Sequence, residues 1–376
     1  MRPAPFLLLL LNFFFLPFSY TITTLPPING GAGSCDDAVE WMKQYSLIAL
    51  GDLNDMRESE GSVFVAGDIN ISGSFNLGLH LNNSNFGSDL GRKSLEVAGD
   101  IVAGNNVNIN RYSGAFSASV TQNGAVQWFV QDKSGGNRMI GVNDGNNGAG
   151  LMQDLTLAAK AAEIEADMLF ATTELCKVTA TSNALLNTNT QNAFLTISDM
   201  TTAVVNLSAI EAADFFNNTT SFTINTPNNN TYDKPIIINI KGATYSVPSS
   251  FNMGNIQSQL YDNVIWNFCE ATSINIPSVV KGSLLAPMAD VTLGNNIDGV
   301  LVGRDISIGS ESHLPFLGVD FSDFCGSELV GIGGTVFEDI GSGGAVENDG
   351  TQEGTEMGVS GVTLQLFRDV NEDLMI

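Results

Sequence analysis

Short apolar runs, each ended by a turn-forming residue, follow one another between residues 264 and 318. The runs are 273–276, 282–285, 290–293, 299–302 and 305–308, and Pro, Gly, Asn or Asp soon ends each of them. Runs of this length and punctuation predict short strands. Segments 282–293 and 299–308 repeat one another loosely, as a hydrophobic strand, a turn and a second strand that opens with Asp. A unit this small cannot bury its own apolar face, so the pattern predicts the stacked coils of a β-solenoid.

The same alternation appears earlier in the chain, at residues 46–51, 61–71 and 94–109. The tetrapeptide VAGD occurs at residues 65–68 and again at 97–100, 32 residues later, which predicts equivalent corners of one solenoid. Asp68, Asp100 and Asp305 each follow Gly or Gly-Arg at such a corner. Carboxylates there could bind calcium. Asp at a tight corner more often accepts a hydrogen bond from the backbone, and we favour that role.

Three segments change from strand spacing to helical spacing. Residues 35–45 carry apolar side chains three and four positions apart and predict a short helix. Residues 151–176 follow a Gly- and Asn-rich breaker and predict a long amphipathic helix. Residues 201–217 predict a strand followed by a short helix, in which Ser208 and Glu211 have the spacing of a capping box.

Four motifs in the solenoid-like region together resemble the signature of choice-of-anchor A domains, a family of extracellular adhesive domains. They are WNFCEAT at 266–272, GSLLAP at 282–287, GVLVG at 299–303 and ExHxPFxG at 311–318. The VAGD pair, the long helix and NIKG at 239–242 match further features of that family, so the resemblance covers about residues 35–318 within a predicted domain of 35–325. It implies a mainly β fold: a right-handed β-solenoid (β-helix), similar to that of ice-binding proteins, with one long α-helix packed alongside.

The composition changes after Cys325, and residues 330–376 resemble the B-type immunoglobulin-like repeat of serine-aspartate-repeat surface adhesins. The resemblance implies a calcium-binding acidic loop, because calcium takes hard oxygen ligands. Its candidate ligands are Asp339, Asn348, Asp349 and Glu356. The insert 341–347 departs from the usual tight loop, and a solvated acidic turn is the alternative. A β-sandwich needs more strands than 47 residues supply, so we expect a truncated, partial repeat.

The N-terminus and the charge both favour an extracellular protein. Residues 1–20 contain Arg2 and then an apolar run that is too short to span a bilayer, which predicts a secretory signal peptide. An N-terminal membrane anchor is the alternative. The chain has 15 basic and 40 acidic residues, a formal charge of −25. This charge excludes nucleic acid and anionic membranes as electrostatic partners, and no membrane span is expected in the mature chain.

The cysteines and the glycosylation sequons agree with secretion. An even number of cysteines, four, without a CxxC motif favours two disulfides over a zinc site. Sequence alone leaves three connectivities open; our preference is Cys35–Cys176 with Cys269–Cys325, the latter closing the far end of the solenoid. Asn-x-Ser/Thr sequons would be used only in a eukaryotic secretory pathway. They begin at Asn70, Asn82, Asn206, Asn217, Asn218 and Asn229.

Catalytic signals are sparse, which favours a secreted or cell-surface adhesive or structural module without catalytic activity. His80 and His313 are the only histidines, and His313 lies inside the ExHxPFxG motif. Glu270 and Glu311 could form a carboxylate pair, as in polysaccharide-acting β-helix enzymes, which is the second alternative. The expected partner is an extracellular glycan or another surface ligand, and apart from calcium no cofactor is expected.

An ice-binding protein is the first alternative, and it requires a flat array of Thr or similar short side chains. The clear strand units instead predict an apolar row and a mixed polar row. The apolar row is Ile69, Ile71, Val291, Leu293, Ile306 and Ile308, and the polar row is Asn70, Thr292 and Ser307. A mixed row suits a solvated or glycan-contacting surface better than ice, so we predict that the protein does not bind ice.

Overall fold

The computed structural model divides the chain into two compact units, Gly30–Ser327 and the combined segments Met1–Asn29 and Glu328–Ile376. It describes residues 18–19, 33–71, 73–81, 93–102, 107–132, 135–142, 150–188, 191–227, 232–325 and 337–338. In the second unit the described part is an antiparallel pair, β1 (Phe18–Ser19) with β29 (Phe337–Glu338). The predicted signal peptide otherwise lies outside the described residues, as does nearly all of the predicted C-terminal repeat.

The larger unit is mainly β, as predicted, and its chain winds through three sheets in turn. The ten-stranded sheet has the order β13 (Leu151–Gln153), β9 (Ser113–Phe116), β7 (Lys93–Val97), β5 (Val63–Val65), β2 (Leu47–Ala49), β26 (Leu301–Gly303), β23 (Ser283–Ala286), β20 (Val264–Phe268), β18 (Ile236–Ile240) and β16 (Ala203–Leu207). All of its strand pairs are parallel. Parallel pairs require a connection that returns to the same end of the sheet, and here the other two sheets provide it.

Most coils of the chain contribute a strand to at least one of these two sheets. The five-stranded sheet has the order β19 (Thr244–Ser246), β21 (Ser273–Ile276), β24 (Asp290–Leu293), β27 (Ile306–Ile308) and β3 (Leu53–Asp55). The nine-stranded sheet has the order β10 (Val120–Gln122), β11 (Gln127–Gln131), β12 (Asn137–Val142), β8 (Val107–Ile109), β6 (Phe75–Leu77), β4 (Glu58–Ser59), β28 (Glu311–His313), β25 (Ile297–Asp298) and β22 (Val280–Lys281). Their inward Ile, Leu, Val and Phe side chains share one core with the ten-stranded sheet.

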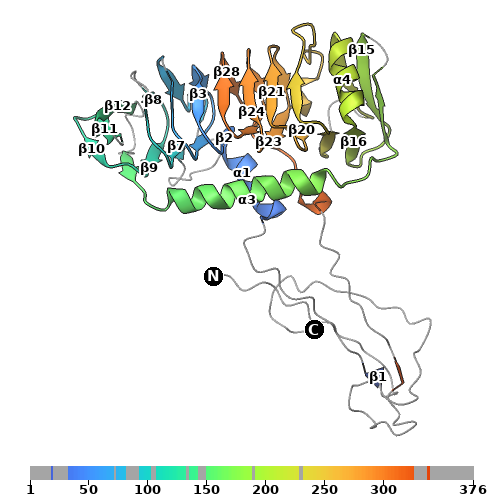
Figure 1. Ribbon diagram of the computed structural model, residues 1–376, viewed down its shortest axis with the longest axis horizontal. Coiled ribbons are helices and arrows are strands. Elements are labelled where there is room, and N and C mark those ends of the chain that lie inside the picture. Colours follow the sequence, from blue (N-terminus) through green and yellow to red (C-terminus); the bar gives the residue numbers. More distant parts are fainter. Residues whose placement is uncertain are drawn as a thin grey trace. The chain divides into compact units, whose positions relative to one another are not determined.

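The first coil of the chain stacks directly on the last one. The strand pairs β2–β26, β3–β27 and β4–β28 join them, one in each sheet. From this junction the N-terminal coils extend to β13 and the C-terminal coils extend to β16, so the middle of the stack holds both ends of the unit (Figure 1). At the β16 end lie helix α4 (Ala209–Asn218) and a three-stranded sheet of β14 (Ala184–Asn187), β15 (Asn192–Ile197) and β17 (Ser221–Asn225).

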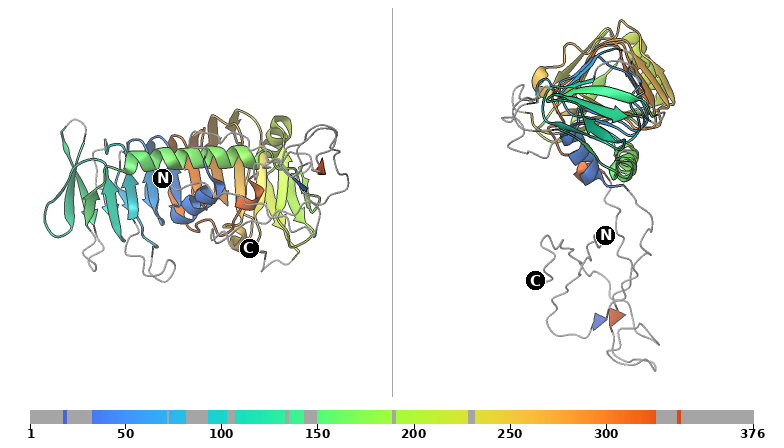
Figure 2. Two further views of the ribbon diagram at one scale, coloured as in Figure 1. Left: turned by 90° about the horizontal axis from the view of Figure 1, so that it is seen from below. Right: turned by 90° about the vertical axis from the view of Figure 1, so that its left-hand side faces the viewer.

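Helix α3 (Leu157–Leu175) links the two ends of the stack by crossing the ten-stranded sheet. Lys160 reaches Glu96 in β7, with 2.7 Å between Nζ and Oε2, and Thr172 reaches Asn267 in β20. Figure 2 shows α3 beside α1 (Cys35–Gln44) on this face. Both faces of the sheet are therefore buried, which explains its nearly continuous runs of Val, Ile and Leu.

The long helix begins later than the sequence predicted. Residues 151–153 form strand β13, and the helix starts after Thr156. The Asp154 carboxylate accepts hydrogen bonds from the Thr156 backbone N–H and hydroxyl, at 2.9 and 2.6 Å, and this local turn separates the two elements. The other helix predictions are confirmed: α1 covers Cys35–Gln44, and Ser208 and Glu211 form the capping box of α4.

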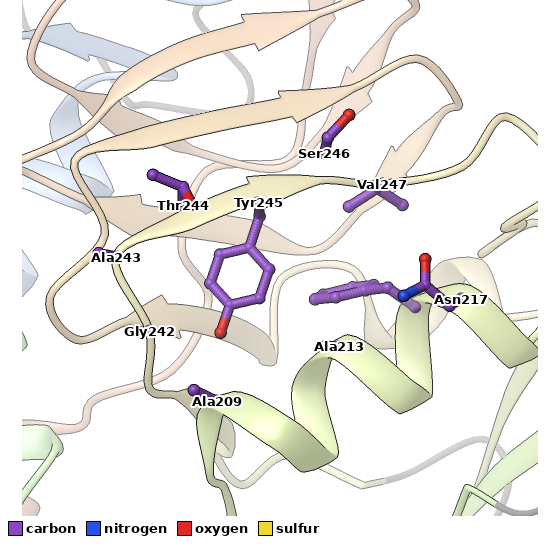
Figure 3. A pocket seen from close by; sticks show the side chains of 10 residues that line it. Ala209, Ala213, Asn217, Gly242, Ala243, Thr244, Tyr245, Ser246 and Val247 are labelled. Atoms are coloured by element: carbon purple, nitrogen blue, oxygen red, sulfur yellow. The ribbon is translucent and has the colours of Figure 1, made fainter.

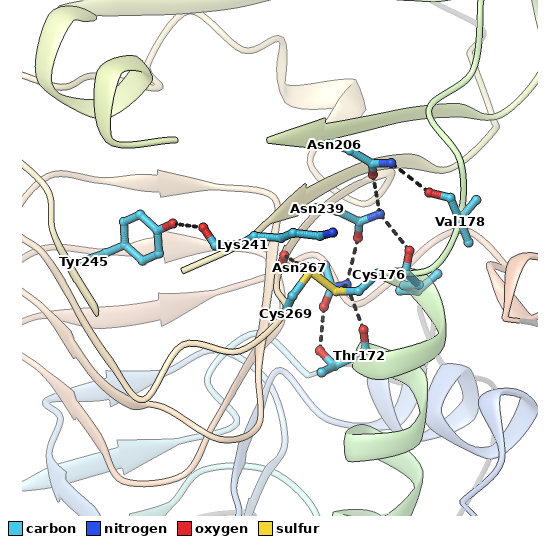
Figure 4. Close-up of a disulfide and its surroundings, with 10 residues drawn as sticks. Thr172, Cys176, Val178, Asn206, Asn239, Lys241, Tyr245, Asn267 and Cys269 are labelled. Atoms are coloured by element: carbon cyan, nitrogen blue, oxygen red, sulfur yellow. Dashed lines mark hydrogen bonds between the residues drawn. A yellow bond between two sulfur atoms is a disulfide. The ribbon is translucent and has the colours of Figure 1, made fainter. Parts of the chain in front are cut away.

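Three asparagines in adjacent strands hold the C-terminal end of α3 (Figure 4). Asn206, Asn239 and Asn267 are in register in β16, β18 and β20, and each amide bonds to the next. Their Nδ2 groups donate to the carbonyl oxygens of Val178, Leu175 and Thr172, at 2.8, 2.7 and 3.2 Å. The carbonyl oxygens of Thr172 and Leu175 also accept from the backbone N–H groups of Cys176 and Val178, so the asparagine ladder gives each a second donor and fastens the end of the helix to the sheet.

The disulfides are Cys35–Cys325 and Cys176–Cys269, and our preferred connectivity was wrong. Cys35 opens α1 and Cys325 follows the last coil, and both lie where the first and last coils meet. Cys176 ends α3 and lies against Cys269 at the end of β20 (Figure 4). The preference placed one disulfide at the far end of the solenoid, whereas stacking of the first coil on the last brings Cys35 and Cys325 together in the middle of the stack. Among the described helices, none is long and apolar enough to cross a membrane.

Candidate functional site

The outer face of the five-stranded sheet carries a row of short polar side chains. Ser246, Asn275, Thr292 and Ser307 are register partners in β19, β21, β24 and β27. The first three are exposed and Ser307 is partly exposed. We call these four residues the polar row. Strands in a sheet lie about 4.8 Å apart, so the row presents hydroxyl and amide groups at a regular spacing.

The residues between these polar positions point inward. Ile274, Val291 and Ile306 are each at most 1% exposed, whereas Asn70 beside the row is partly exposed. The predicted division into an apolar row and a mixed polar row is therefore confirmed. A second outward row runs through Thr244, Ser273 and Asp290, whose carboxylate pairs with Arg304 (Nε to Oδ1, 2.8 Å). This face is polar and mixed in chemistry.

A pocket of about 370 Å³ lies at the β19 end of this face, between β19 and α4 (Figure 3). Its helix side is lined by Ala209, Ala213 and Asn217, which are four residues apart and therefore lie on one face of α4. Its strand side is lined by residues 242–247. No charged side chain is among the lining residues, so the pocket is neutral.

Two aromatic side chains form the floor of this pocket. Tyr245 is 8% exposed and Phe216 is 2% exposed, and their rings pack edge-to-face with centroids 5.7 Å apart. The Tyr245 hydroxyl donates to the carbonyl oxygen of Lys241, and burial, followed by the charge of Glu270, raises the pKa of this phenol. Gly242 has φ +135°, and a Cβ there would lie 2.5 Å from the Tyr245 hydroxyl, so only glycine fits.

The nine-stranded sheet carries a cluster of ionisable groups at β22, β25 and β28. His313 Nδ1 lies 2.9 Å from Asp298 Oδ1, and His313 Nε2 lies 3.0 Å from Glu311 Oε2. Asp298 also pairs with Lys281. Burial alone would lower the pKa of His313, but the hydrogen bonds that its ring donates to the Glu311 and Asp298 carboxylates outweigh this effect and raise the pKa. Each cation faces a carboxylate, so the cluster ties three coils together.

The two carboxylates predicted as a catalytic pair are not brought together. Glu270 lies exposed in the turn between β20 and β21, close enough to Tyr245 to affect its pKa. Glu311 lies in β28 of the nine-stranded sheet, in register with Glu58. One lies in a turn and the other in the nine-stranded sheet, and the linear sequence does not reveal this separation.

The corner aspartates bond to backbone, as favoured from the sequence. Asp68 Oδ1 accepts from the backbone N–H of Asp100 at 2.8 Å, and Asp305 Oδ1 accepts from that of Asp52 at 2.8 Å. Within the described residues, no group of three or more His, Cys, Asp or Glu could hold a metal ion. The predicted calcium ligands Asp339, Asn348, Asp349 and Glu356 lie outside the described residues.

Sequence reasoning missed the pocket. Asn217 attracted attention only as a sequon and Tyr245 only as part of a strand. The signal that could have indicated the pocket is Gly242, a glycine between two β segments, followed by the alternation Thr-Tyr-Ser. That pattern predicts an edge strand with an inward aromatic residue, but it does not reveal that α4 lies opposite.

A stack of parallel β-coils with an exposed polar face and a neutral pocket has the features of a binding module. A family model described as "Putative Ice-binding-like adhesive domain" matches residues 38–314, and the chain belongs to this family. This confirms the predicted relation to adhesive, ice-binding-like domains. The narrower resemblances, to choice-of-anchor A domains and to the B-type repeat, receive no support from the comparisons.

Solved structures that the chain matches include ice-binding proteins, each at low identity and low TM-score. The glycosylated ice-binding protein LeIBP from an Arctic yeast is 9% identical, with a TM-score of 0.27, 74% of this chain covered and 94% of that chain. The ice-binding protein of the Antarctic ascomycete Antarctomyces psychrotrophicus is 9% identical, with a TM-score of 0.29 and 72% and 94% covered. A domain of Shewanella frigidimarina ice-binding protein 1 is 9% identical, with a TM-score of 0.30 and 73% and 95% covered. A search of curated proteins finds no match.

Proposed function

We propose that the chain is a secreted, non-catalytic adhesive module that binds an extracellular glycan or similar polar surface ligand through its five-stranded sheet. The polar row is the observation that carries this proposal. Ser246, Asn275 and Thr292 combine exposed donors and acceptors with short side chains, and short side chains lose little rotamer entropy on binding. The module would be a right-handed β-solenoid of the choice-of-anchor A kind.

Several features of the chain support an extracellular, non-enzymatic role. Two disulfides are typical of proteins in oxidising compartments. In the described part of the chain, both ring nitrogens of His313 lie within hydrogen-bond distance of carboxylates, those of Asp298 and Glu311. Of the candidate pair, Glu270 lies in the turn between β20 and β21 and Glu311 lies in β28. A convergent acid, base and nucleophile is what an active site would need.

Calcium binding in the C-terminal segment remains part of this proposal. Asp339, Asn348, Asp349 and Glu356 would supply oxygen ligands. Calorimetric titration of the full chain with calcium tests it, with the variant D349N as comparison. Weaker binding by the variant supports the site, and equal binding by both proteins contradicts it.

Ice binding is the second candidate, and the hydroxyls of Ser246, Thr292 and Ser307 favour it, because they lie in one register across the sheet. Asn275 interrupts that array, and the neighbouring row contains the Asp290–Arg304 ion pair. To bind ice, the ordered water on this face would have to match the ice lattice over many coils. We therefore expect no thermal hysteresis and no ice shaping at micromolar protein; faceted crystals would make ice binding the leading function.

A pull-down on insoluble polysaccharides tests the adhesive proposal. The double variant Asn275→Lys/Thr292→Lys places two long cationic side chains on the polar row. Ala158→Lys/Ala159→Lys makes the same charge change at exposed positions of α3, away from this sheet. Retention should fall about tenfold or more in the first variant and stay unchanged in the control. Equal loss in both variants, or retention of the wild type on none of the polysaccharides, would argue against the proposal.

A further inference from the structure

We propose that the pocket between α4 and β19 is a sugar-binding subsite that takes one neutral saccharide residue at the end of the adhesive face. This inference rests on the proposed adhesive function and narrows its ligand. The pocket and the polar row share Ser246, which lines the pocket and is also the first member of the row. A glycan whose terminal residue sits in the pocket could therefore continue along Asn275 and Thr292.

The chemistry of the lining residues selects a neutral, hydroxyl-rich ligand. The pocket is lined by the amide of Asn217 and by the β19 segment 242–247, over a floor made by Phe216 and Tyr245. Without a charged residue in the lining, an ionised ligand would lose its hydration and gain no counter-charge. A sugar ring instead offers hydroxyls to the polar groups and C–H faces to the apolar ones. A volume of about 370 Å³ lies at the small end of ligand pockets.

The free edge of β19 adds backbone donors and acceptors. In the described part of the sheet β19 is the terminal strand, paired only with β21. The Ala243 carbonyl and the Val247 N–H bond to that neighbour, which places the backbone groups of residues 243, 245 and 247 on the β21 side. The N–H and C=O groups of Thr244 and Ser246 consequently point the opposite way, because alternate residues face opposite edges of a strand. Unpaired groups at a pocket wall are available to a ligand.

Asn217 is the residue best placed to recognise the ligand. Its side chain is exposed, and among the described residues no hydrogen bond engages its amide. The next residue, Asn218, is also exposed but does not line the pocket. The pair therefore offers a matched comparison within one turn of the same helix.

Binding of methyl glycosides to the full, oxidised chain tests the proposal, with protein made in a host that adds no N-glycans. Saturation-transfer NMR would screen neutral methyl glycosides of hexoses and N-acetylhexosamines beside charged glucuronate and glucosamine. At least one neutral glycoside should bind and the charged ones should not. N217A should weaken the binding about tenfold, the value of one hydrogen bond of about 1.4 kcal/mol, whereas N218A should leave it unchanged.

A pocket-filling variant gives the second measurement. Ala213→Leu places a larger side chain on the pocket wall, and Ala159→Leu makes the same change on the exposed side of α3. The first should abolish glycoside binding with an unchanged melting temperature, and the second should not. The proposal is wrong if no neutral glycoside binds, if charged ones bind equally, or if Ala213→Leu binds like wild type. The polysaccharide pull-down separates the two proposals. If a polysaccharide retains wild type and Ala213→Leu equally, the pocket is not a sugar-binding subsite, while the adhesive function still stands.

Discussion

Asp305 accepts, at Oδ1, a hydrogen bond from the backbone N–H of Asp52 at 2.8 Å, although 253 residues separate them in sequence. The same contact recurs at the next corners: Asp52 accepts from Asp68 at 2.7 Å, and Asp68 accepts from Asp100 at 2.8 Å. The joint between the last coil and the first coil is therefore built like the joints within the N-terminal half. We infer that the two halves unfold as one cooperative unit.

The corner glycines should tolerate no side chain. In Gly99→Ala the new Cβ would lie 2.0 Å from the carbonyl oxygen of Gly67 and 2.6 Å from the Asp68 carboxylate. The coils would have to separate, so we expect a loss of about 1–3 kcal/mol in the free energy of unfolding by urea. Gly73→Ala is the control, because nothing lies within 4 Å of its Cβ, and it should change stability by less than about 0.5 kcal/mol. Equal effects would show that the coils are not in close contact at Gly99.

Disulfide mapping should find peptides containing Cys35 joined to Cys325 and Cys176 joined to Cys269, in non-reducing digests analysed by mass spectrometry. Replacing both members of either pair with Ser should lower the free energy of unfolding by about 2–5 kcal/mol. Removing the Cys35–Cys325 disulfide should lower the free energy of unfolding more than removing Cys176–Cys269. The first disulfide spans 290 residues and the second 93, and the entropy of loop closure grows with length. A Cys35–Cys176 peptide would overturn the observed stacking of first coil on last.

A substitution in the asparagine ladder should lower the free energy of unfolding far more than the same substitution in the polar row. Asn267→Ala leaves the Thr172 hydroxyl and the Asn239 amide oxygen without their buried partner, so we expect a loss of about 2–3 kcal/mol in the free energy of unfolding. Asn275→Ala removes the same side chain from the exposed sheet and should cost less than about 0.5 kcal/mol. Chemical unfolding monitored by circular dichroism compares them. Similar losses would mean that α3 does not depend on the ladder.

Stability should fall as the pH rises past neutrality, and His313 should be a cause. Its pKa in the folded chain is raised, since Glu311 and Asp298 outweigh the opposing effect of burial. A raised histidine pKa stabilises the fold fully below the unfolded value of about 6.5, and this stabilisation is lost as pH rises through the folded pKa. Unfolding free energies measured from pH 6 to pH 9 should therefore fall less in His313→Gln than in wild type.

His80 provides the control for this pH profile. Its side chain is 63% exposed, and its Nδ1 lies 3.3 Å from Oε1 of Glu60. His80→Gln should keep the wild-type slope of stability against pH. If His313→Gln keeps that slope too, the ion cluster on the nine-stranded sheet does not stabilise the fold through its histidine.

The sequence by itself determined the features that depend on neighbouring residues. Short apolar runs closed by Gly, Asp and Pro predicted strands near Ser273–Ile276 and Asp290–Leu293, because the side-chain period and turn chemistry are local. The spacing of Ser208 and Glu211 predicted a capped helix for the same reason. The VAGD repeat predicted equivalent corners, and Asp68 and Asp100 do occupy them. These predictions needed no knowledge of which coil lies beside which.

Only the tertiary structure decided which distant segments meet. The Cys35–Cys325 disulfide follows from the stacking of the first coil on the last, and Cys176–Cys269 follows from the path of α3. The pocket follows from the position of α4 beside β19. Any apolar coil can in principle stack on any other, so hydrophobic pattern does not specify their order. That order is set by packing over the whole core and by long-range contacts such as Asp305 with Asp52, which become visible only when the chain is folded.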